Sequence, residues 1–464
     1  MEALHELGLA EASRRMREGA LSPVALAEAM LERIAALEPK LHAFARVTDE
    51  RALEDAHRAE AELARGQWRG PLHGVPIALK DLVDTAGIAT EAGMKALRGR
   101  VPDEDSTVAA RLREAGAVLL GKLAMTEGAF AEHHPEVQPP LNPWRGEHWT
   151  GVSSSGSGVA VAAGLCLGAL GSDTGGSIRF PSAACGITGL KPTWGRVSRH
   201  GIFPLAPSLD HVGPMARSAE DAALLLGAIA GADPSDPTAL RAPTEDYAGA
   251  LDRGIRGVTV GIDRDWCLAG VDGEVADSFD AALDSLASAG AELRAVRMPD
   301  TTALAAGWVA ACAVEAALAH EAIFRERGGD YGPALAALVH IGGTLPAVEY
   351  ARIGAARLEI GARLAALFDE VALLATPALP LPVPTLAEAA AGTAEPAQML
   401  RFTALWNFAG NPTLSLPCGF DRAGLPIGFQ IVGPALGEAA LLAAGAAFQR
   451  ITDWHRRRPP VARL

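Results

Sequence analysis

Residues 151–182 read GVSSSGSGVAVAAGLCLGALGSDTGGSIRFPS, and this stretch decides how the chain is interpreted. It opens with serines among glycines, passes through an apolar segment, and closes on Thr174, Gly175, Gly176 and Ser177. Glycines beside a serine allow backbone N–H groups to converge on one point, and a helix start adds the positive end of its dipole. Such a point stabilises a developing oxyanion, by roughly 2.7 to 4 kcal/mol for each donor. The stretch therefore predicts an acyl-transfer site with Ser177 as the candidate nucleophile.

A flexible linker is the main alternative for this string, because Gly/Ser-rich composition is typical of linkers. In this chain, however, the string continues without a break into VAVAAGLCLGAL (159–170). That segment is too apolar to be solvated. We therefore expect the stretch to enter the core of the protein.

The stretch also resembles the signature of a known family of serine hydrolases, the amidase signature family. Its opening is matched by GVSSSG (151–156). Its close is matched by Asp173, Gly175, Ser177, Arg179 and Pro181. A third family motif, a lysine after an apolar strand, is matched by GVPIALKD (74–81), which contains Lys80. The resemblance extends through GLKPTWGRVS and SLDHVGPMARS to GLPIGFQIVGP, and so covers most of the chain.

The resemblance implies a Ser-Ser-Lys triad that works through an acyl-enzyme. Ser177 would attack the carbonyl carbon, and Ser153, which in the family follows a cis peptide bond, would connect Ser177 to Lys80. Lys80 would take the proton and return it through Ser153 to the leaving nitrogen. The oxyanion would be held by backbone N–H groups of Thr174 to Ser177.

Four further residues are expected to hold the loop of this site in place without contacting the substrate. An acidic and a basic residue that flank a tight loop usually brace it, and arginine cannot act as a base. The supporting residues are Ser154, Asp173, Arg179 and Asp210.

The proposed role of Lys80 requires an uncharged amine in the resting enzyme. An ordinary lysine has a pKa of about 10.4, so burial must lower the pKa to about 7. The apolar PIAL (76–79) before Lys80 suits such a buried amine. We expect Lys80 to be buried without a carboxylate partner, and a salt bridge to Asp81 or Asp84 would contradict its role.

The order of the predicted elements indicates an α/β protein. Residues 1–66 read as a helical flank, and strands alternate with helices from about residue 70 onward. Alternation of this kind predicts an α/β/α sandwich over 67–464, with a mixed, mainly parallel central sheet covered by helices. The alanine-rich segment 301–368 is expected to form a helical cap over the site.

Composition narrows the classes of partner. The chain has 464 residues and a net charge of −14, which argues against direct binding to nucleic acid or to an anionic membrane. Its longest apolar run, 159–170, is shorter than the ~20 residues of a membrane span. The five scattered cysteines and the absence of a metal-binding motif predict a cytoplasmic enzyme with no metal or cofactor. A homodimer is one expected assembly.

The nature of the reaction leaves alternatives open. The first reading is an amidase that cleaves the C–N bond of an amide, including an aryl amide or a carbamate. Aromatic residues expected near the cavity could line an aryl pocket: Trp144, Trp149, Phe203, Phe402 and Trp406. The second reading is the catalytic subunit of a glutamine-dependent tRNA amidotransferase.

The second reading is less favoured because such relatives would carry an acidic residue before the ANLAG-like stretch. This chain has Leu400 and Arg401 there. A binding protein without catalysis is a minor reading, since all three triad residues are present. A Cys-His scheme through Cys166 or Cys185 is disfavoured because both lie in apolar segments.

Overall fold

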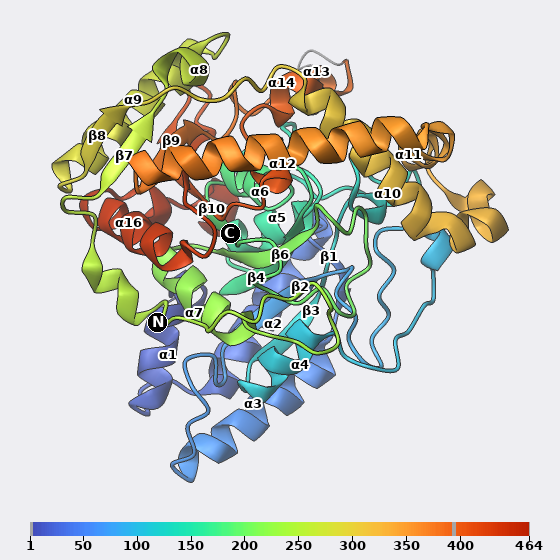
Figure 1. The fold of residues 1–464 in the computed structure, drawn as a ribbon. Helices are drawn as coiled ribbons and strands as arrows, with labels where there is room; N and C mark the ends of the chain where they lie inside the picture. Colours follow the sequence, from blue (N-terminus) through green and yellow to red (C-terminus); the bar gives the residue numbers. More distant parts are fainter. Residues whose placement is uncertain (1–2, 392–395, 464) are drawn as a thin grey trace.

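The computed structural model describes residues 3–391 and 396–463, and its centre is a single eleven-stranded sheet (Figure 1). The strands are β1 (Phe44–Val47), β2 (Pro76–Lys80), β3 (Val118–Leu123), β4 (Gly168–Asp173), β5 (Thr188–Lys191), β6 (His211–Ala216), β7 (Thr259–Ile262), β8 (Glu292–Ala295), β9 (Leu373–Pro377), β10 (Thr413–Phe420) and β11 (Pro426–Val432). Their order across the sheet is β1-β3-β2-β4-β6-β5-β10-β11-β9-β7-β8. The central strands β2, β4, β5 and β6 are buried throughout, including polar residues such as Asp173 and Lys191.

Strand direction departs from the expectation of a mainly parallel sheet. The sheet is mixed, but six of the ten strand pairings in the described part of the chain are antiparallel. The parallel pairings are β2 with β3 and β4, and β7 with β8 and β9. Strand direction depends on how segments far apart in the sequence pair, as β6 does with β4, and short buried strands carry no local pattern that fixes it.

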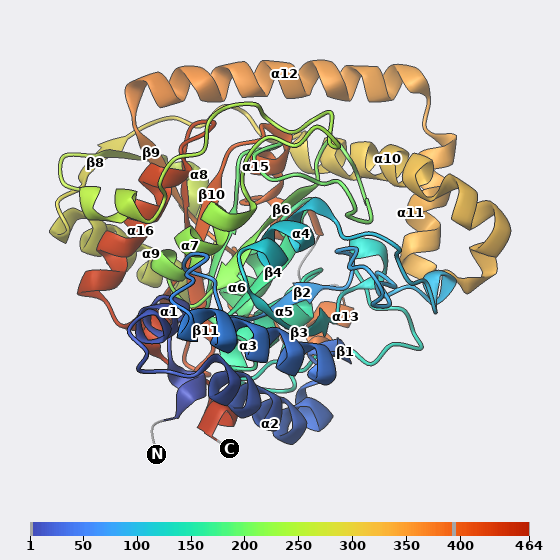
Figure 2. The same ribbon diagram turned by 90° about the horizontal axis from the view of Figure 1, so that it is seen from below.

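Helices surround the sheet, as expected for the fold class (Figures 1 and 2). They are α1 (Leu9–Arg17), α2 (Pro23–Leu41), α3 (Asp49–Ala64), α4 (Thr107–Glu114), α5 (Ser155–Ala163), α6 (Arg179–Cys185), α7 (Ala219–Ile229), α8 (Arg264–Leu268), α9 (Gly273–Ser288), α10 (Leu304–Arg327), α11 (Pro333–Thr344), α12 (Ala347–Glu370), α13 (Leu386–Ala390), α14 (Pro396–Leu400), α15 (Ala404–Phe408) and α16 (Glu438–Ile451). Figure 2 shows α2 and α12 at opposite sides of the molecule.

The N-terminal flank contains one element that the sequence analysis did not expect. Residues 1–66 hold helices α1, α2 and α3, but the short strand β1 lies between α2 and α3 and pairs antiparallel with β3. Helix α2 begins at Pro23 and is capped by Ser22, whose hydroxyl accepts a hydrogen bond from Ala25 N. The flank therefore contributes the outermost strand of the central sheet as well as covering helices.

The parallel strands β2 and β4 place the candidate residues at one edge of the sheet. Leu79 of β2 is in register with Leu170 of β4, so the carboxyl ends of both strands lie side by side. Lys80 ends β2, and Asp173 ends β4. Neighbouring parallel strands end at the same edge, where α/β proteins commonly place their sites.

The segment expected to form a helical cap does consist of helices. It holds α10, α11 and most of α12, and α10 packs against α11 and α15 (Figure 2). By length and composition alone, the stretch Ala306–Asp330 could cross a bilayer, and 39% of its apolar window is buried here. The bent pair α11 and α12 also passes that test if it is counted as one span. Core helices of soluble proteins pass the same test of length and composition.

Candidate active site

Lys80 is fully buried, and its amine is surrounded by hydroxyl groups. Its Nζ lies 2.6 Å from Ser153 Oγ, 2.9 Å from Ser154 Oγ and 2.9 Å from Ser172 Oγ. Burial lowers the pKa of Lys80 to about 7, even though the more distant charges of Asp173 and Asp210 act to raise it.

Lys80 also has no carboxylate partner among the described residues. Asp84 forms a salt bridge with Arg100 at 2.6 Å. Asp81 accepts a hydrogen bond from Glu91 N at 3.1 Å. The environment that the sequence analysis expected for Lys80 is therefore present.

The serine cluster converges on this amine from the start of α5. Ser153 and Ser154 are fully buried, and the peptide bond between Val152 and Ser153 is cis. Ser154 Oγ donates to Ser172 O at 3.1 Å, so this hydroxyl acts as an acceptor toward Lys80. Gly156 allows the first turn of α5 to pack closely against the backbone of Ala43, because a Cβ at that position would lie 2.3 Å from Ala43 O.

Ser177 lies in the loop between β4 and α6 and is the only partly exposed residue of 171–180. Its backbone carbonyl accepts a hydrogen bond from Ser154 N at 3.3 Å, which ties this loop to the serine cluster. Within the described residues, no hydrogen bond is formed by the Ser177 hydroxyl. The Ser177 side chain is therefore partly exposed and has no partner that competes for its hydroxyl among the described residues.

The N–H groups of the loop 174–177 differ in their availability. Gly176 N donates to Asp173 Oδ1 at 2.8 Å and is therefore already used. In the described part of the chain, the N–H groups of Thr174, Gly175 and Ser177 make no hydrogen bond. These three donors remain available to an oxyanion.

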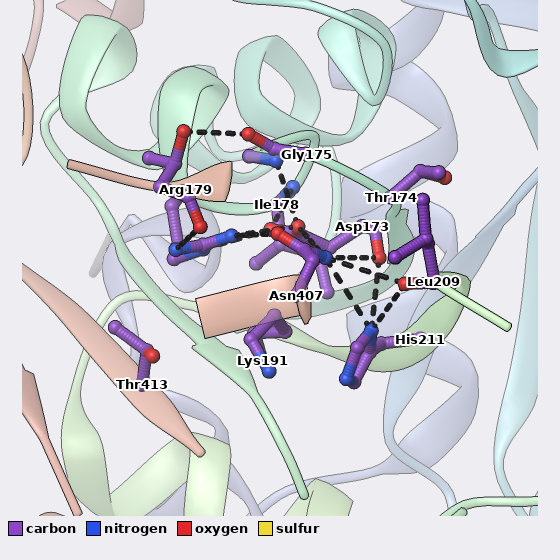
Figure 3. Close-up of polar contacts among 12 residues, drawn as sticks. Asp173, Thr174, Gly175, Ile178, Arg179, Lys191, Leu209, His211, Asn407 and Thr413 are labelled. Carbon is purple, nitrogen blue, oxygen red and sulfur yellow. Dashed lines mark hydrogen bonds and ion pairs between the residues drawn. The ribbon is translucent and has the colours of Figure 1, made fainter. Parts of the chain in front are cut away.

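Asp173 and Arg179 brace this loop through a buried network (Figure 3). Both side chains are fully buried, and Arg179 Nη2 and Nε lie 2.9 and 3.0 Å from the two oxygens of Asp173. Burial alone would raise the pKa of Asp173, but Arg179 outweighs it and holds the pKa well below its usual range. Asn407 Nδ2 donates to Asp173 Oδ1 at 2.9 Å, and Ile178 N donates to Oδ2 at 3.0 Å. The pair therefore fixes the backbone on both sides of Ser177.

Asp210 supports the same loop from the start of β6. Its carboxylate accepts hydrogen bonds from Thr174 Oγ1 at 2.6 Å and from the backbone of Leu205 and Ala206. Burial raises the pKa of Asp210. Its contacts place it behind the loop, as the sequence analysis expected.

Comparison with known proteins agrees with this geometry. The Amidase family matches residues 25–442 of the chain. The chain is 44% identical to AmiD of Mycobacterium tuberculosis (strain ATCC 25618 / H37Rv), a protein named as a putative amidase, over 99% of this chain and 97% of AmiD. The chain belongs to the amidase family. It is thus a hydrolase of carbon–nitrogen bonds, and the resemblance stated from its motifs is confirmed.

Two other relatives of this amidase are informative. A glutamyl-tRNA(Gln) amidotransferase subunit from Roseiflexus sp. (strain RS-1) is 41% identical over 99% of each chain. The crystal structure of the peptide amidase of Stenotrophomonas maltophilia superposes with a TM-score of 0.83 at 33% identity, over 98% of each chain. Similarity along the whole chain is therefore shared with amidases and with amidotransferase subunits.

Of the five aromatic residues expected to line a pocket, Trp144 and Trp149 pack against one small apolar cluster, formed by Ala184, Val383 and Leu425. Trp406 and Phe402 are fully buried in the core, where Phe402 packs against Trp266. Trp144 lines a separate cavity of about 510 Å³ beside Phe420 and Trp454.

The other two pocket candidates are partly exposed. Phe203 contacts His320, with 5.3 Å between the ring centroids. Trp149 lies near the site, because its ring contacts Phe180, whose ring packs against Gly176. Of the five, Trp149 is therefore the one that these contacts connect to the Ser177 loop.

Several residues of the site were missed by sequence reasoning. Ser172 contacts Lys80, and Asn407 and Gln430 complete the network around Arg179. Ser172 could have been found, because it directly precedes Asp173 in a strand that ends beside Lys80. Asn407 and Gln430 lie more than 200 positions from Arg179, and no local pattern connects them. No group of side chains that could hold a metal ion occurs in the parts of the chain described here.

Proposed function

We propose that this chain hydrolyses a small amide or carbamate, with Ser177 as nucleophile, Ser153 as proton bridge and Lys80 as base. The Ser177 proton passes to Ser153 while the Ser153 proton passes to Lys80, and the Ser177 oxygen bonds to the acyl carbon. The protonated Lys80 then returns its proton along the same path to the leaving nitrogen as the C–N bond breaks. Water releases the acyl group by repeating these transfers, and no cofactor is required.

The environment of Lys80 is the observation that supports this proposal. An uncharged amine has two N–H donors and one lone pair, and three hydroxyl groups lie within 2.9 Å of it. Ser154 is an acceptor toward Lys80, since its own hydroxyl hydrogen goes to Ser172 O. If Ser154 and Ser172 accept the two N–H groups, the lone pair is left for the Ser153 hydroxyl. That is the arrangement a general base needs.

The available N–H groups would stabilise the tetrahedral intermediate. We assign the oxyanion to Gly175 and Ser177, whose peptide groups flank the Gly176 N–H that Asp173 already holds. Each donor of this kind contributes roughly 100-fold or more to kcat. An aryl acyl group would pack against Trp149 and Phe180, so we expect aryl amides to be better substrates than acetamide.

A substrate panel tests the proposal. Wild type and Ser177→Ala are incubated with acetamide, aryl amides, anilides and an aryl carbamate, and released ammonia and amine are measured separately. We expect turnover by wild type and a loss of roughly 1,000-fold or more in Ser177→Ala. Equal activity in both proteins would contradict the role of Ser177 as the nucleophile. Equal rates on acetamide and aryl amides would contradict the expected preference for aryl amides.

A second candidate function is supply of ammonia to a tRNA amidotransferase, which the 41% identity to the amidotransferase chain from Roseiflexus favours. The position where an acid would hold the glutamine ammonium is occupied by Arg401. Its guanidinium donates to the backbone carbonyls of Ala269 and Trp266 and lies over the Phe402 ring. This function would be favoured over the first if the chain released ammonia from glutamine and from no other amide of the panel, and did so only in the presence of added partner proteins.

A further inference from the structure

Trp308 connects the helical cap to the loop that carries the nucleophile. It lies in the first turns of α10 and is 7% exposed. Its indole Nε1 donates a hydrogen bond to the carbonyl oxygen of Thr174 at 2.8 Å. The ring covers Gly175 so closely that a Cβ at that position would lie 2.4 Å from Trp308 Cζ2. Trp308 therefore both bonds and packs against the peptide between Thr174 and Gly175.

The hydrogen bond from Trp308 also determines where the Gly175 N–H points. In a planar trans peptide the C=O and the N–H point in opposite directions. The described chain has one cis bond, at Val152–Ser153, so the Thr174–Gly175 peptide is trans. Because Trp308 holds the Thr174 carbonyl, the Gly175 N–H points away from α10.

The next two peptides of the loop are held in the same manner by other partners. The Gly175 carbonyl accepts from Thr403 Oγ1 at 2.5 Å, and the N–H of that peptide goes to Asp173. The Gly176 carbonyl accepts from Phe180 N at 2.7 Å, which leaves the Ser177 N–H on the opposite side. Each of the three peptide groups thus has a dedicated donor on its carbonyl. Of these three donors, Trp308 is the one that comes from the cap.

We propose that Trp308 is a positioning residue for the oxyanion: its indole N–H keeps the Gly175 N–H aimed at the oxygen that becomes negatively charged. This inference rests on the proposed function of the Ser177 loop. Without Trp308 Nε1, the buried Thr174 carbonyl loses its donor, and the Thr174–Gly175 peptide is free to rotate toward other partners. Removal of this hydrogen bond therefore weakens stabilisation of the oxyanion in the transition state and leaves binding of the neutral substrate unchanged.

The test compares Trp308→Phe with a matched control, Trp266→Phe. Trp266 Nε1 donates to Thr301 Oγ1 at 3.1 Å, so the control loses the same kind of indole hydrogen bond away from the loop. Three quantities are measured in wild type and both variants: kcat and KM for the best amide of the panel, and the affinity of an aryl trifluoromethyl ketone. This ketone adds to the serine and mimics the oxyanion.

We expect Trp308→Phe to lower kcat by about tenfold to 100-fold with KM within about twofold of wild type. The ketone affinity should fall by the same factor as kcat, whereas Trp266→Phe should leave both near wild type. The inference would be overturned if Trp308→Phe had the same kcat and the same ketone affinity as Trp266→Phe. A parallel rise in KM with unchanged ketone affinity would also overturn it, because that pattern indicates a role in substrate packing.

A second variant covers the case in which Trp308→Phe fails to fold. Replacement of Trp308 by β-(3-benzothienyl)alanine keeps the bicyclic shape and exchanges the N–H for sulfur. We expect the same fall in kcat and ketone affinity, and wild-type values in this variant would overturn the inference. If wild type cleaves amides and Ser177→Ala does not, wild-type values in the Trp308 variant refute only the role of Trp308 and leave the proposed function standing. Absence of Ser177-dependent cleavage in wild type refutes the proposed function and this inference with it.

Discussion

Lys80 Nζ lies 2.6 Å from Ser153 Oγ, at the carboxyl end of β2 and beside the carboxyl end of β4. The amine is shielded from water and has no described carboxylate as a partner, whereas Ser177, whose backbone carbonyl accepts from Ser154 N, is partly exposed. A buried amine and a partly exposed serine are thus held near one edge of the sheet. The mechanism proposed above requires a proton to pass from Ser177 through Ser153 to Lys80.

The activity should depend on pH through Lys80. Because the pKa of Lys80 is lowered to about 7, the uncharged base is present above that pH and is lost below it. We expect kcat/KM to rise about tenfold per pH unit below pH 7 and to level off above it. Measurement from about pH 5.5 to pH 9 with one amide checks this, and a flat profile would contradict it. Lys80→Arg should be inactive throughout, since arginine does not lose its proton.

The stability of the fold should also depend on Lys80. The unfolded chain, with an ordinary lysine pKa near 10.5, binds a proton that the folded chain lacks between pH 7 and 10.5. Stability contributed through Lys80 therefore rises with pH across that window and is constant below it. We expect the free energy of unfolding of wild type relative to Lys80→Met to increase from about pH 7 to pH 10 by several kcal/mol. Urea denaturation at several pH values measures it, and an equal dependence in both proteins would count against a depressed pKa.

Removal of Asp173 should destabilise the protein strongly. Asp173→Ala leaves the fully buried Arg179 charge without its partner, which costs about 3–5 kcal/mol. Arg297→Ala is the control, because Arg297 and Asp265 form a pair that is 78% and 85% exposed. The free energy of unfolding of Arg297→Ala should stay within about 1 kcal/mol of the wild-type value. Urea unfolding of both variants measures the two changes. Similar losses of free energy of unfolding in the two variants would contradict a stabilising role of the buried pair.

Thiol alkylation should leave activity unchanged. All five cysteines are free and buried, and burial raises the pKa of Cys166 to about 12. Treatment of the native protein with iodoacetamide at about pH 7.5, followed by mass spectrometry and an activity assay, should give no modification and full activity. Loss of activity in step with alkylation of Cys166 or Cys185 would instead support a Cys-His mechanism.

Much of the fold could be predicted from local sequence. The segment PIALK forms β2 as expected, and Ser106 caps α4 by accepting from Ala109 N. Strand direction could not be predicted, because it depends on long-range pairing, such as that of β10 with β5. Strand β1 was missed since FARV is short, and its pairing with β3 decides its conformation.

The candidate site was predictable where its chemistry lies within a motif. Lys80 and Ser153, to which the resemblance gave catalytic roles, lie 2.6 Å apart, and Asp173, which was expected to support the loop, pairs with Arg179. The contributions of Trp308, Asn407 and Gln430 could not be predicted, because each reaches the loop from a distant part of the chain. The Gly176 N–H was expected to bind the oxyanion, but it donates to Asp173, a bond that no sequence pattern reveals. The division into residues 1–66 and 67–464, the homodimer and the cytoplasmic location stay predictions.

Titration of the Lys80 amine itself decides whether this group can serve as the base. The chain has five lysines, so ¹³C-labelling of lysine side chains gives few NMR signals, and Lys80→Met identifies the signal of Lys80 by its absence. We predict that this signal titrates near pH 7, the pKa to which burial lowers this amine. A Lys80 signal that stays in its charged form up to about pH 10, as for an ordinary lysine, would contradict a buried, uncharged base.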